Sequence, residues 1–279
     1  MSVSTVSAQH LQNSVLAQIS AQIREYAGID IPQNRYYFLK GRIERRIKEL
    51  NLDSLKTYAE FLASSKGERE MEALINEVTV NETFFFRQEG HIRFLEKYVL
   101  PELARKQAQV HLWSAACSSG EEIYTLALMV EEYWKKQFPG LRFHLLASDI
   151  DSSVLKEAQE GKYSTYSVRK VPRSLLQKYF TQRNGLYCLS PTIIRQVQFK
   201  KINLCRDRDY LGLSEQDVIF CANVLIYFDK EVKIKVVENL HRKLKKGGYL
   251  ILGFSETLYG ISDKFETVRK EGVMTYRKT

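Results

Sequence analysis

Apolar residues recur at helical spacing from Leu16 to Val80, and no alternating strand pattern interrupts them. Three stretches rich in turn-forming residues, at 28–32, 51–54 and 64–67, separate the periodic segments. The pattern therefore predicts a small all-helical domain, which we place at residues 1–85.

One of these helices has a strongly basic side. Residues 35–48 hold six Lys or Arg and a single acid, Glu44. The apolar face is formed by Leu39, Ile43, Ile47 and Leu50. Arg42, Arg45 and Arg46 fall on another face. Charged faces are usually only solvated, but this density makes the three arginines a candidate docking surface for an acidic partner.

The pattern changes after Arg87. Segments rich in β-branched and aromatic residues, typical of strands, lie at 110–113, 142–149, 197–204, 217–228, 249–254 and 273–277. Helical segments lie between several of them, at 121–136, 153–159 and 230–244. This alternation predicts a second, α/β domain at 86–279, with a mostly parallel sheet whose ligands bind at the carboxyl ends of its strands.

Composition limits the classes of function. The formal net charge of +9 is unevenly distributed, because residues 1–86 hold ten Lys or Arg against eleven acids, which leaves 32 against 22 for the remainder. Basic proteins often bind nucleic acids, but we expect no nucleic-acid partner here. The four cysteines form no C-x-x-C pair, so neither a zinc site nor another metal site is expected. No apolar run is long enough for a membrane span, and we expect a cytoplasmic monomer that does not insert into membranes.

The first predicted strand of the α/β domain runs into the loop WSAACSSGEEIYT, which begins at Trp113. Its small residues, Ala116 among them, and Gly120 allow the backbone to bend and approach a ligand. Glu121 and Glu122 stand at the start of the following helix. Such carboxylates commonly stabilise a helix start, but here they would also repel a phosphate and favour a ligand with an ammonium group.

Further polar residues follow the next strands. Asp149 ends the second strand, where a carboxylate in nucleotide-binding folds takes ribose hydroxyls, although it fits a helix cap equally well. Asn203 with Leu204 and Asn223 follow later strands. A nucleoside with an amino-acid tail and without phosphates fits this set, and S-adenosylmethionine has that composition.

The stretch NETFFFR, residues 81–87, places Asn81, Thr83 and Arg87 around three aromatic rings. Taken alone, such a run is more often a piece of buried core with the arginine reaching water. With WSAACSSGEE, ASDID, INL and NVLIYFD, in this order and spacing, it closely resembles the chemotaxis receptor methyltransferase (CheR) family. The resemblance covers nearly the whole chain.

The resemblance implies a class I S-adenosylmethionine-dependent methyltransferase fold behind a helical receptor-recognition domain, with a small β insertion. It implies methylation of glutamate side chains on the cytoplasmic helices of chemoreceptors, with S-adenosylhomocysteine as the product. The residues implied to line the cofactor are Asn81, Thr83, Arg87, Ala116, Glu121 or Glu122 or both, Asp149, Asn203, Leu204, Ala222 and Asn223. The basic helix would engage the acidic receptor helix through Arg42, Arg45 and Arg46.

Methylation of a glutamate needs little acid–base chemistry, since the side chain is already ionised at neutral pH. The enzyme mainly has to align the reacting atoms and exclude water. We therefore expect Arg87 to hold the substrate carboxylate and the Tyr227 hydroxyl to orient the substrate or the cofactor tail. Without the resemblance, the sequence favours Tyr227 as an ordinary core aromatic residue with a hydrogen-bonded hydroxyl.

Two departures from the family leave alternatives open. Ala222 stands where members usually have arginine, so a poorly active regulator that binds cofactor and receptor is the second hypothesis. An RNA methyltransferase is the third, because many of these enzymes share the fold. The predicted β insertion is shorter than in members that dock on a carboxyl-terminal receptor pentapeptide, so we expect no need for that tether.

Overall fold

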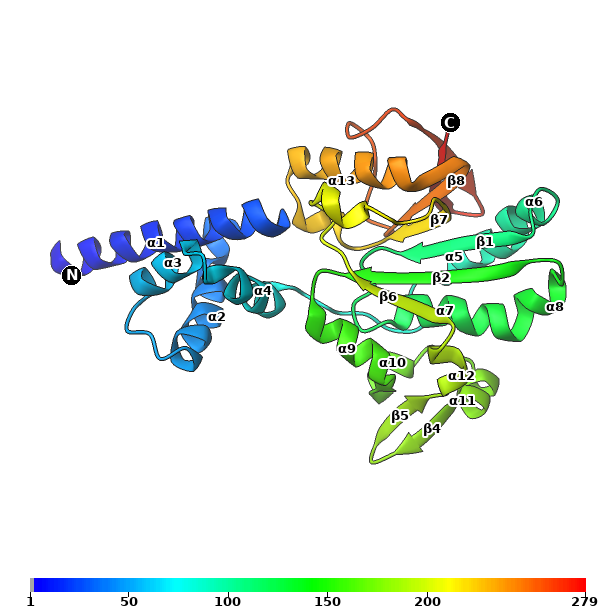
Figure 1. Ribbon diagram of the computed structural model, residues 1–279, viewed down its shortest axis with the longest axis horizontal. Helices are drawn as coiled ribbons and strands as arrows, with labels where there is room; N and C mark the ends of the chain where they lie inside the picture. Colours follow the sequence, from blue (N-terminus) through cyan, green and yellow to red (C-terminus); the bar gives the residue numbers. More distant parts are fainter. Residues whose placement is uncertain (1–2) are drawn as a thin grey trace. The chain divides into compact units, whose positions relative to one another are not determined.

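A computed structural model describes residues 3–279. The contacts divide the chain into two units (Figure 1). One comprises the chain up to Val80 together with Tyr227–Val232, and the other comprises Asn81–Ile226 and Lys233–Thr279.

The first unit is helical, as the sequence predicts. Its helices are α1 (Val3–Ala27), a 3₁₀ turn (Gln33–Arg35), α2 (Tyr36–Glu49), α3 (Leu55–Ala63) and α4 (Gly67–Val78). Ile19, Ile23 and Leu74 are fully buried among them. Each helix begins or ends close to the predicted breaks; the Ser54 hydroxyl, for example, accepts the Thr57 N–H at 3.1 Å and caps α3.

A short segment from much later in the chain, Tyr227–Val232, belongs to this helical unit. Phe228 pairs with Ile29 in an isolated antiparallel bridge, and the Asp229 carboxylate lies 2.5 Å from the Arg24 guanidinium. The apolar Phe228 side chain is buried. The helical unit is thus assembled from two separate pieces of chain.

The second unit is built on a seven-stranded sheet in the order β6-β2-β1-β7-β8-β10-β9. Its strands are β1 (Gln109–Ser114), β2 (Arg142–Asp149), β6 (Val197–Lys201), β7 (Gln216–Cys221), β8 (Leu244–Leu252), β9 (Phe265–Lys270) and β10 (Val273–Lys278). All neighbours are parallel except β10, which runs antiparallel to β8 and β9. The mostly parallel sheet is confirmed.

Helices connect the strands in two opposite directions along the sheet. The helices after Asn81 are α5 (Glu89–Phe94), α6 (Leu100–Ala104), α7 (Glu121–Met129), α8 (Lys135–Gln137), α9 (Ser152–Glu160), α10 (Thr165–Val168), α11 (Arg173–Tyr179), α12 (Pro191–Ile194) and α13 (Lys230–Lys243), with π-helical turns at Leu95–Val99 and Val130–Trp134 and 3₁₀ turns at Asp207–Tyr210 and Leu225–Tyr227. All lie in this unit except Tyr227 and the first three residues of α13, which belong to the helical unit. Because α7 leads from β1 outward to β2 and α13 leads from β7 outward to β8, right-handed crossovers place the two helices on opposite faces.

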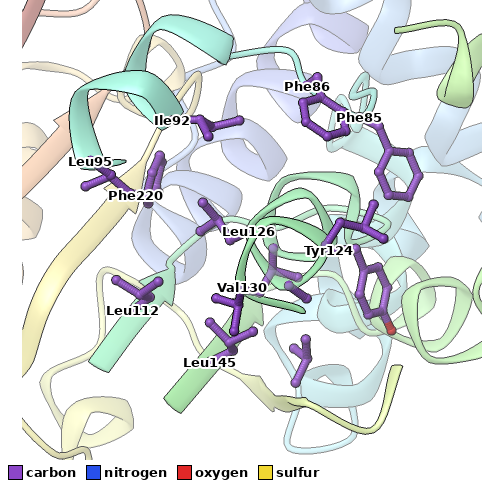
Figure 2. Packing of buried hydrophobic residues seen from close by; sticks show 14 of the residues in the cluster. Phe85, Phe86, Ile92, Leu95, Leu112, Tyr124, Leu126, Val130, Leu145 and Phe220 are labelled. Carbon is purple, nitrogen blue, oxygen red and sulfur yellow. The ribbon is translucent and has the colours of Figure 1, made fainter. Parts of the chain in front are cut away.

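The hydrophobic core of this unit packs α7 against the sheet and against Phe85 and Phe86 (Figure 2). Leu126 and Val130 belong to the same buried cluster as Leu112 of β1 and Leu145 of β2. Phe85 is fully buried in it, with its ring centroid 4.8 Å from that of Tyr163. The aromatic run at 84–86 is therefore partly a core element.

A separate three-stranded sheet, in the order β3-β5-β4, is the small β insertion that the fold class predicts. Its strands are β3 (Lys162–Tyr163), β4 (Phe180–Arg183) and β5 (Leu186–Leu189). Asn184 and Gly185 both have positive φ, 49° and 77°, as a two-residue type I′ hairpin requires. β4 and β5, the two strands of this hairpin, have four residues each, so the hairpin is short.

Among the helices that the structure describes, none has the length and apolar character needed to cross a membrane.

Candidate functional site

The direction of the crossovers reverses between β1 and β7, and in open α/β sheets ligands bind beyond the carboxyl ends of strands at such a point. The loop after β1 lies across the ends of the neighbouring strands. Ala115 N–H donates to the Phe220 carbonyl on β7 at 2.7 Å, and Ser118 N–H donates to Asp149 Oδ2 after β2 at 2.9 Å. These bonds fix the loop over the switch point.

The loop depends on two residues in left-handed conformation. Ser118 has φ +50° and Gly120 has φ +93°. A Cβ atom at Gly120 would lie 2.9 Å from Ala158 Cβ and 3.0 Å from the Tyr124 ring. Only glycine therefore lets the chain turn this tightly into α7.

α7 begins with two glutamates, Glu121 and Glu122, whose carboxylates have different hydrogen-bond partners. Glu121 is buried and its Oε2 accepts the Ser119 hydroxyl at 2.7 Å. Glu122 Oε1 accepts the Ser114 hydroxyl, at the end of β1, at 2.7 Å. Burial raises the pKa of Glu122 to about 7, while the Ser114 bond and the positive charge of Arg87 act in the opposite direction. Glu122 is therefore the one placed beside both β1 and Arg87.

Asp149 is buried at the end of β2. Its Oδ2 accepts Ser118 N–H and its Oδ1 accepts Asp151 N–H at 3.0 Å. Burial raises the pKa of Asp149 to about 6, against the effect of these backbone N–H groups. The helix cap is supplied by its neighbour, since Asp151 Oδ1 accepts the N–H groups of Ser153 and Val154. The alternative in which Asp149 itself caps the helix is wrong.

The segment 81–87 lies against the loop and α7. Asn81 donates through Nδ2 to Asp151 Oδ2 at 2.8 Å, and its carbonyl accepts the Ser118 hydroxyl at 2.9 Å. Phe86, with φ +58°, donates its N–H to Thr125 Oγ1 at 3.0 Å. Thr83 is half-buried in the same segment. The segment is thus part of the site wall.

Arg87 closes this segment. Its Nη1 donates to the Glu82 carbonyl at 2.7 Å, and its positive charge acts to lower the pKa of Glu122. Ala116 is half-buried in the loop after β1. Arg87, Glu122 and Ala116 are therefore brought to the same end of the sheet.

The residues after β6 form a buried turn. Asn203 Oδ1 accepts Cys205 N–H at 3.0 Å, and the Asn203 N–H donates to Asp209 Oδ2 at 2.8 Å. The Leu204 carbonyl accepts the Tyr210 hydroxyl at 2.9 Å. The predicted strand at 197–204 is thus too long, because β6 ends at Lys201.

Glu256 is a site residue that the sequence analysis missed. Its Oε2 accepts the N–H groups of Asn223 at 2.6 Å and Gly253 at 2.7 Å, and its Oε1 accepts Ile226 N–H at 3.3 Å. One buried carboxylate therefore joins the loops after β7 and β8, and its charge also raises the pKa of Glu122. The available signal was its position in GFSETL, directly after a predicted strand.

Ala222 and Asn223 follow β7. Both are half-buried, and Asn223 has φ +62°. The predicted strand at 217–228 is wrong beyond Cys221, because the left-handed Asn223 ends it and Leu225–Tyr227 form a 3₁₀ turn. An open pocket beside Glu256 is lined by Leu225, Ile226, Lys233, Ser255, Thr257, Tyr259 and Ile261.

Tyr227 and the three predicted docking arginines belong to the helical unit. Tyr227 is half-buried, and its carbonyl accepts Asp30 N–H at 2.9 Å. Arg45 lies 2.6 Å from the Glu77 carboxylate and keeps 51% of its side chain exposed; Arg42 lies 3.9 Å from the same group.

Arg46 has different surroundings. Its guanidinium binds both oxygens of Glu70, through Nε at 2.9 Å and Nη2 at 2.7 Å, and only 15% of its side chain is exposed. The Tyr58 hydroxyl donates to Glu70 Oε1 at 2.7 Å. Arg46 therefore holds α2 against α3 and α4, and we remove it from the docking surface.

The strand order, the antiparallel β10 and the glycine-bent loop after β1 define a class I S-adenosylmethionine-dependent methyltransferase. Two family models match the chain: "CheR methyltransferase, SAM binding domain" at residues 81–274 and "CheR methyltransferase, all-alpha domain" at residues 14–79. The chain belongs to the CheR methyltransferase family. Its cofactor is S-adenosylmethionine, so the predicted family, enzyme class and cofactor are confirmed.

Similar proteins match this chain over most of their own length. Chemotaxis protein methyltransferase 2 of Vibrio cholerae is 37% identical over 87% of this chain and 85% of its own. The chemotaxis protein methyltransferase of Borreliella burgdorferi is 34% identical over 84% of each chain, and chemotaxis protein methyltransferase 1 of Pseudomonas aeruginosa is 33% identical over 91% and 94%.

Proposed function

We propose that this enzyme methylates glutamate side chains on the cytoplasmic helices of chemoreceptors, as part of adaptation in chemotaxis-type signalling, and that it acts in the cytoplasm as a monomer. The observation that carries the proposal is that Glu122, bonded to Ser114 at the carboxyl end of β1, and the segment that carries Arg87, bonded to Thr125 and Ser118, lie at the same end of the sheet. The Arg87 cation suits a carboxylate acceptor, and the half-buried Glu122 suits the ammonium group of the cofactor. Membership of the CheR family supports the same reaction.

The donor groups around the switch point fit S-adenosylmethionine better than a phosphate-bearing nucleotide. The start of α7 holds two carboxylates, Glu121 and Glu122, where a phosphate-binding loop presents free N–H groups. The Asp149 carboxylate uses one acceptor position on each oxygen for backbone N–H groups and keeps further lone pairs for ribose hydroxyls. The residues to which we assign cofactor contact are Asn81, Thr83, Arg87, Ala116, Glu121, Glu122, Asp149, Asn203, Leu204, Ala222 and Asn223.

We assign the ammonium end of the cofactor to Glu122 rather than Glu121. Glu122 lies beside β1 and Arg87, whereas Glu121 is turned toward Ser119. A Glu122 that is half ionised near pH 7 becomes fully ionised when a cation binds beside it.

When bound, S-adenosylmethionine supplies an electrophilic methyl group that a carboxylate accepts without any proton transfer. The protein's task is then orientation. Arg87 holds the acceptor carboxylate with charge-assisted hydrogen bonds, and the Tyr227 hydroxyl orients the substrate or the cofactor tail. Buried side chains around the loop, such as Phe85 and Phe86, exclude water.

Receptor docking is assigned to Arg42 and Arg45. Arg45 is exposed and Arg42 is half-buried, and Glu77 is their shared acidic neighbour. An acidic receptor helix would compete with that single carboxylate. The β4–β5 hairpin is short, and we further propose that this enzyme methylates receptors without binding a carboxyl-terminal receptor pentapeptide. Micromolar binding of such a peptide in a titration would refute this.

The test is methyl transfer from labelled S-adenosylmethionine to cytoplasmic fragments of chemoreceptors from the same cell, with release of volatile label by mild base. Base-labile counts with the wild type, lost in Asp149→Ala and kept in the exposed control Glu160→Gln, would support a carboxyl methyl ester. Cofactor binding without counts would favour the poorly active regulator, with Ala222 as the suspected cause. Counts on total RNA alone would favour the RNA methyltransferase.

A further inference from the structure

A cluster of cations surrounds one aromatic ring beside the segment 81–87. The Arg169 guanidinium carbon lies 3.6 Å from the ring centroids of both Phe84 and Tyr166. The Lys170 ammonium lies 5.2 Å from the Phe84 centroid, and the Arg87 guanidinium lies 5.8 Å from it. We call these five residues the cationic aromatic cluster.

The three cations are not neutralised within their own unit. Within residues 3–279, none of Arg87, Arg169 and Lys170 takes part in an ion pair with a carboxylate. Two acids stand two residues from the cluster in sequence: Glu82 accepts the Tyr166 hydroxyl through Oε1 at 2.7 Å, and Glu89 pairs with Arg93 at 2.5 Å. The cluster thus presents a net positive potential, which attracts acidic groups.

Arg169 is held in place within the cluster. Its Nη1 donates to the Tyr166 carbonyl at 2.6 Å, and the two rings lie within cation–π distance of the guanidinium. Arg169 and Lys170 nevertheless remain exposed, and Tyr166 is 51% exposed. A positioned guanidinium with free donors loses little entropy when it binds a carboxylate.

The cluster begins at the wall of the cofactor site. Phe85 N–H donates to the Ser167 carbonyl of α10 at 3.0 Å, and Phe86 N–H donates to Thr125 of α7. Arg87 is shared between the two regions, since it belongs to the cluster and its charge acts on Glu122. The cations therefore extend from the reacting end of the site outward to α10.

We propose that Arg169 and Lys170 bind a second carboxylate of the substrate, close in space to the glutamate that Arg87 holds for methylation. This inference rests on the proposed function and adds a specificity rule: acceptor glutamates with an acidic neighbour are preferred. The aromatic rings of Phe84 and Tyr166 position the arginine and contact the apolar part of the neighbouring side chain.

The experiment uses the full-length enzyme and a receptor cytoplasmic fragment whose methylated glutamates have been mapped by mass spectrometry. Acidic residues within one helical turn of an acceptor are replaced by glutamine. With the wild type, this replacement should raise KM about tenfold, since each exposed ion pair contributes up to about fivefold. With Arg169→Gln/Lys170→Gln, KM should already be raised to that extent, and the replacement should add nothing.

The matched control is Arg105→Gln/Lys246→Gln. It removes one arginine and one lysine, both exposed, near the amino-terminal ends of β1 and β8. This control should keep the preference for an acidic neighbour, and both double variants should keep the wild-type cofactor affinity and Tm. Arg169→Lys/Lys170→Arg, which keeps both charges, should restore most of the preference. Should the double glutamine variant fold poorly, Lys170→Gln alone should lose part of the preference.

Three results would overturn the inference. The first is methyl transfer by the wild type that is indifferent to the neighbouring acid. The second is an Arg169→Gln/Lys170→Gln enzyme whose KM rises equally for the fragment with the acidic neighbour and for the fragment in which glutamine replaces it. The third is inhibition of the wild type, but not of this variant, by total RNA, which would assign the cluster to phosphate. Absence of any methylated glutamate would instead refute the proposed function, and the inference with it.

Discussion

At the scale of single residues, Glu122 combines a cost in stability with a gain in binding. Its side chain is half-buried beside β1, and desolvation of the carboxyl group raises its pKa from 4.5 to about 7. A carboxyl whose pKa is raised in the folded state stabilises the fold most below its unfolded pKa, and this contribution is lost as pH rises through 7. At pH 8 the unliganded enzyme therefore holds an ionised, poorly solvated group.

Glu122→Gln should raise the free energy of unfolding of the unliganded enzyme at pH 8 by about 2 kcal/mol. The rise in pKa from 4.5 to about 7 corresponds to about 3.5 kcal/mol at about 1.4 kcal/mol per pKa unit, and the partial exposure of the half-buried side chain reduces this value. It should also weaken cofactor binding roughly tenfold or more, because a charged hydrogen bond is lost. Denaturant titration and calorimetry measure the two effects. Affinity of the wild type should fall as pH drops from 8 to 6. The variant should lose most of this dependence and keep only the part that Asp149, with a pKa of about 6, contributes near the lower limit; Glu160→Gln should behave as the wild type.

Arg87→Ala should weaken cofactor binding more at pH 7 than at pH 9. Removal of the positive charge raises the pKa of Glu122 further, so less of the carboxylate is ionised near neutrality. Calorimetry at the two pH values measures the difference, and Arg87→Lys should keep most of the wild-type behaviour. An equal loss at both pH values would mean that Arg87 contacts the cofactor without acting through Glu122.

The residues of the site could be predicted where they follow a strand directly. Asp149 and Glu122 were found in this way, because strand ends and helix starts have recognisable sequences. Glu256 was missed because its role depends on N–H groups of Asn223, Gly253 and Ile226, which come from two separate loops. No local pattern shows that one carboxylate serves both.

At the scale of elements, the loops after β7 and β8 depend on that one carboxylate. Glu256→Ala should lower the free energy of unfolding by about 2–4 kcal/mol, because three backbone N–H groups lose their acceptor. Cofactor binding should also weaken, since Asn223 is no longer held at φ +62°. Denaturant titration measures the first effect, with Glu266→Ala, an exposed acid on β9, as the control. Equal stability of the two variants would show that water replaces Glu256.

Substitution of two neighbouring arginines on α2 should affect different properties, stability for Arg46 and receptor affinity for Arg45. Arg46→Ala should lower the free energy of unfolding by about 2–4 kcal/mol, because it leaves Glu70 buried without its cation. Arg45→Ala should change it by less than about 0.5 kcal/mol but should raise KM for the receptor fragment several-fold. A stability loss as large in Arg45→Ala would remove α2 from the docking surface.

Element prediction succeeded where periodicity was long and failed where tertiary contacts decide the backbone. The strand at 142–149 agrees with β2 at both ends, and the helix at 121–136 is nearly continuous. By contrast, Leu225–Tyr227 has a strand-like composition but forms a 3₁₀ turn. β9 was missed because its polar residues show little of the alternation expected of a half-buried strand.

At the scale of the whole molecule, where the formal net charge is +9, the basic residues of the two units differ in how far acids neutralise them. In the helical unit, the cations of α2 share a few acids. In the methyltransferase unit, unpaired cations gather around Phe84. Since screening weakens exposed charges, both surfaces should contribute more at low salt.

The Tyr227–Val232 segment also restricts how such a gene can be rearranged in evolution. A recombination event that exchanged the front helices for those of another protein would leave Phe228 and Asp229 facing a foreign helix without Ile29 and Arg24. A gene that encoded the back of the chain alone would produce an exposed Phe228. Although the chain is described by two family models, its halves are not freely exchangeable modules, and the helical front and its late-encoded segment must be inherited together.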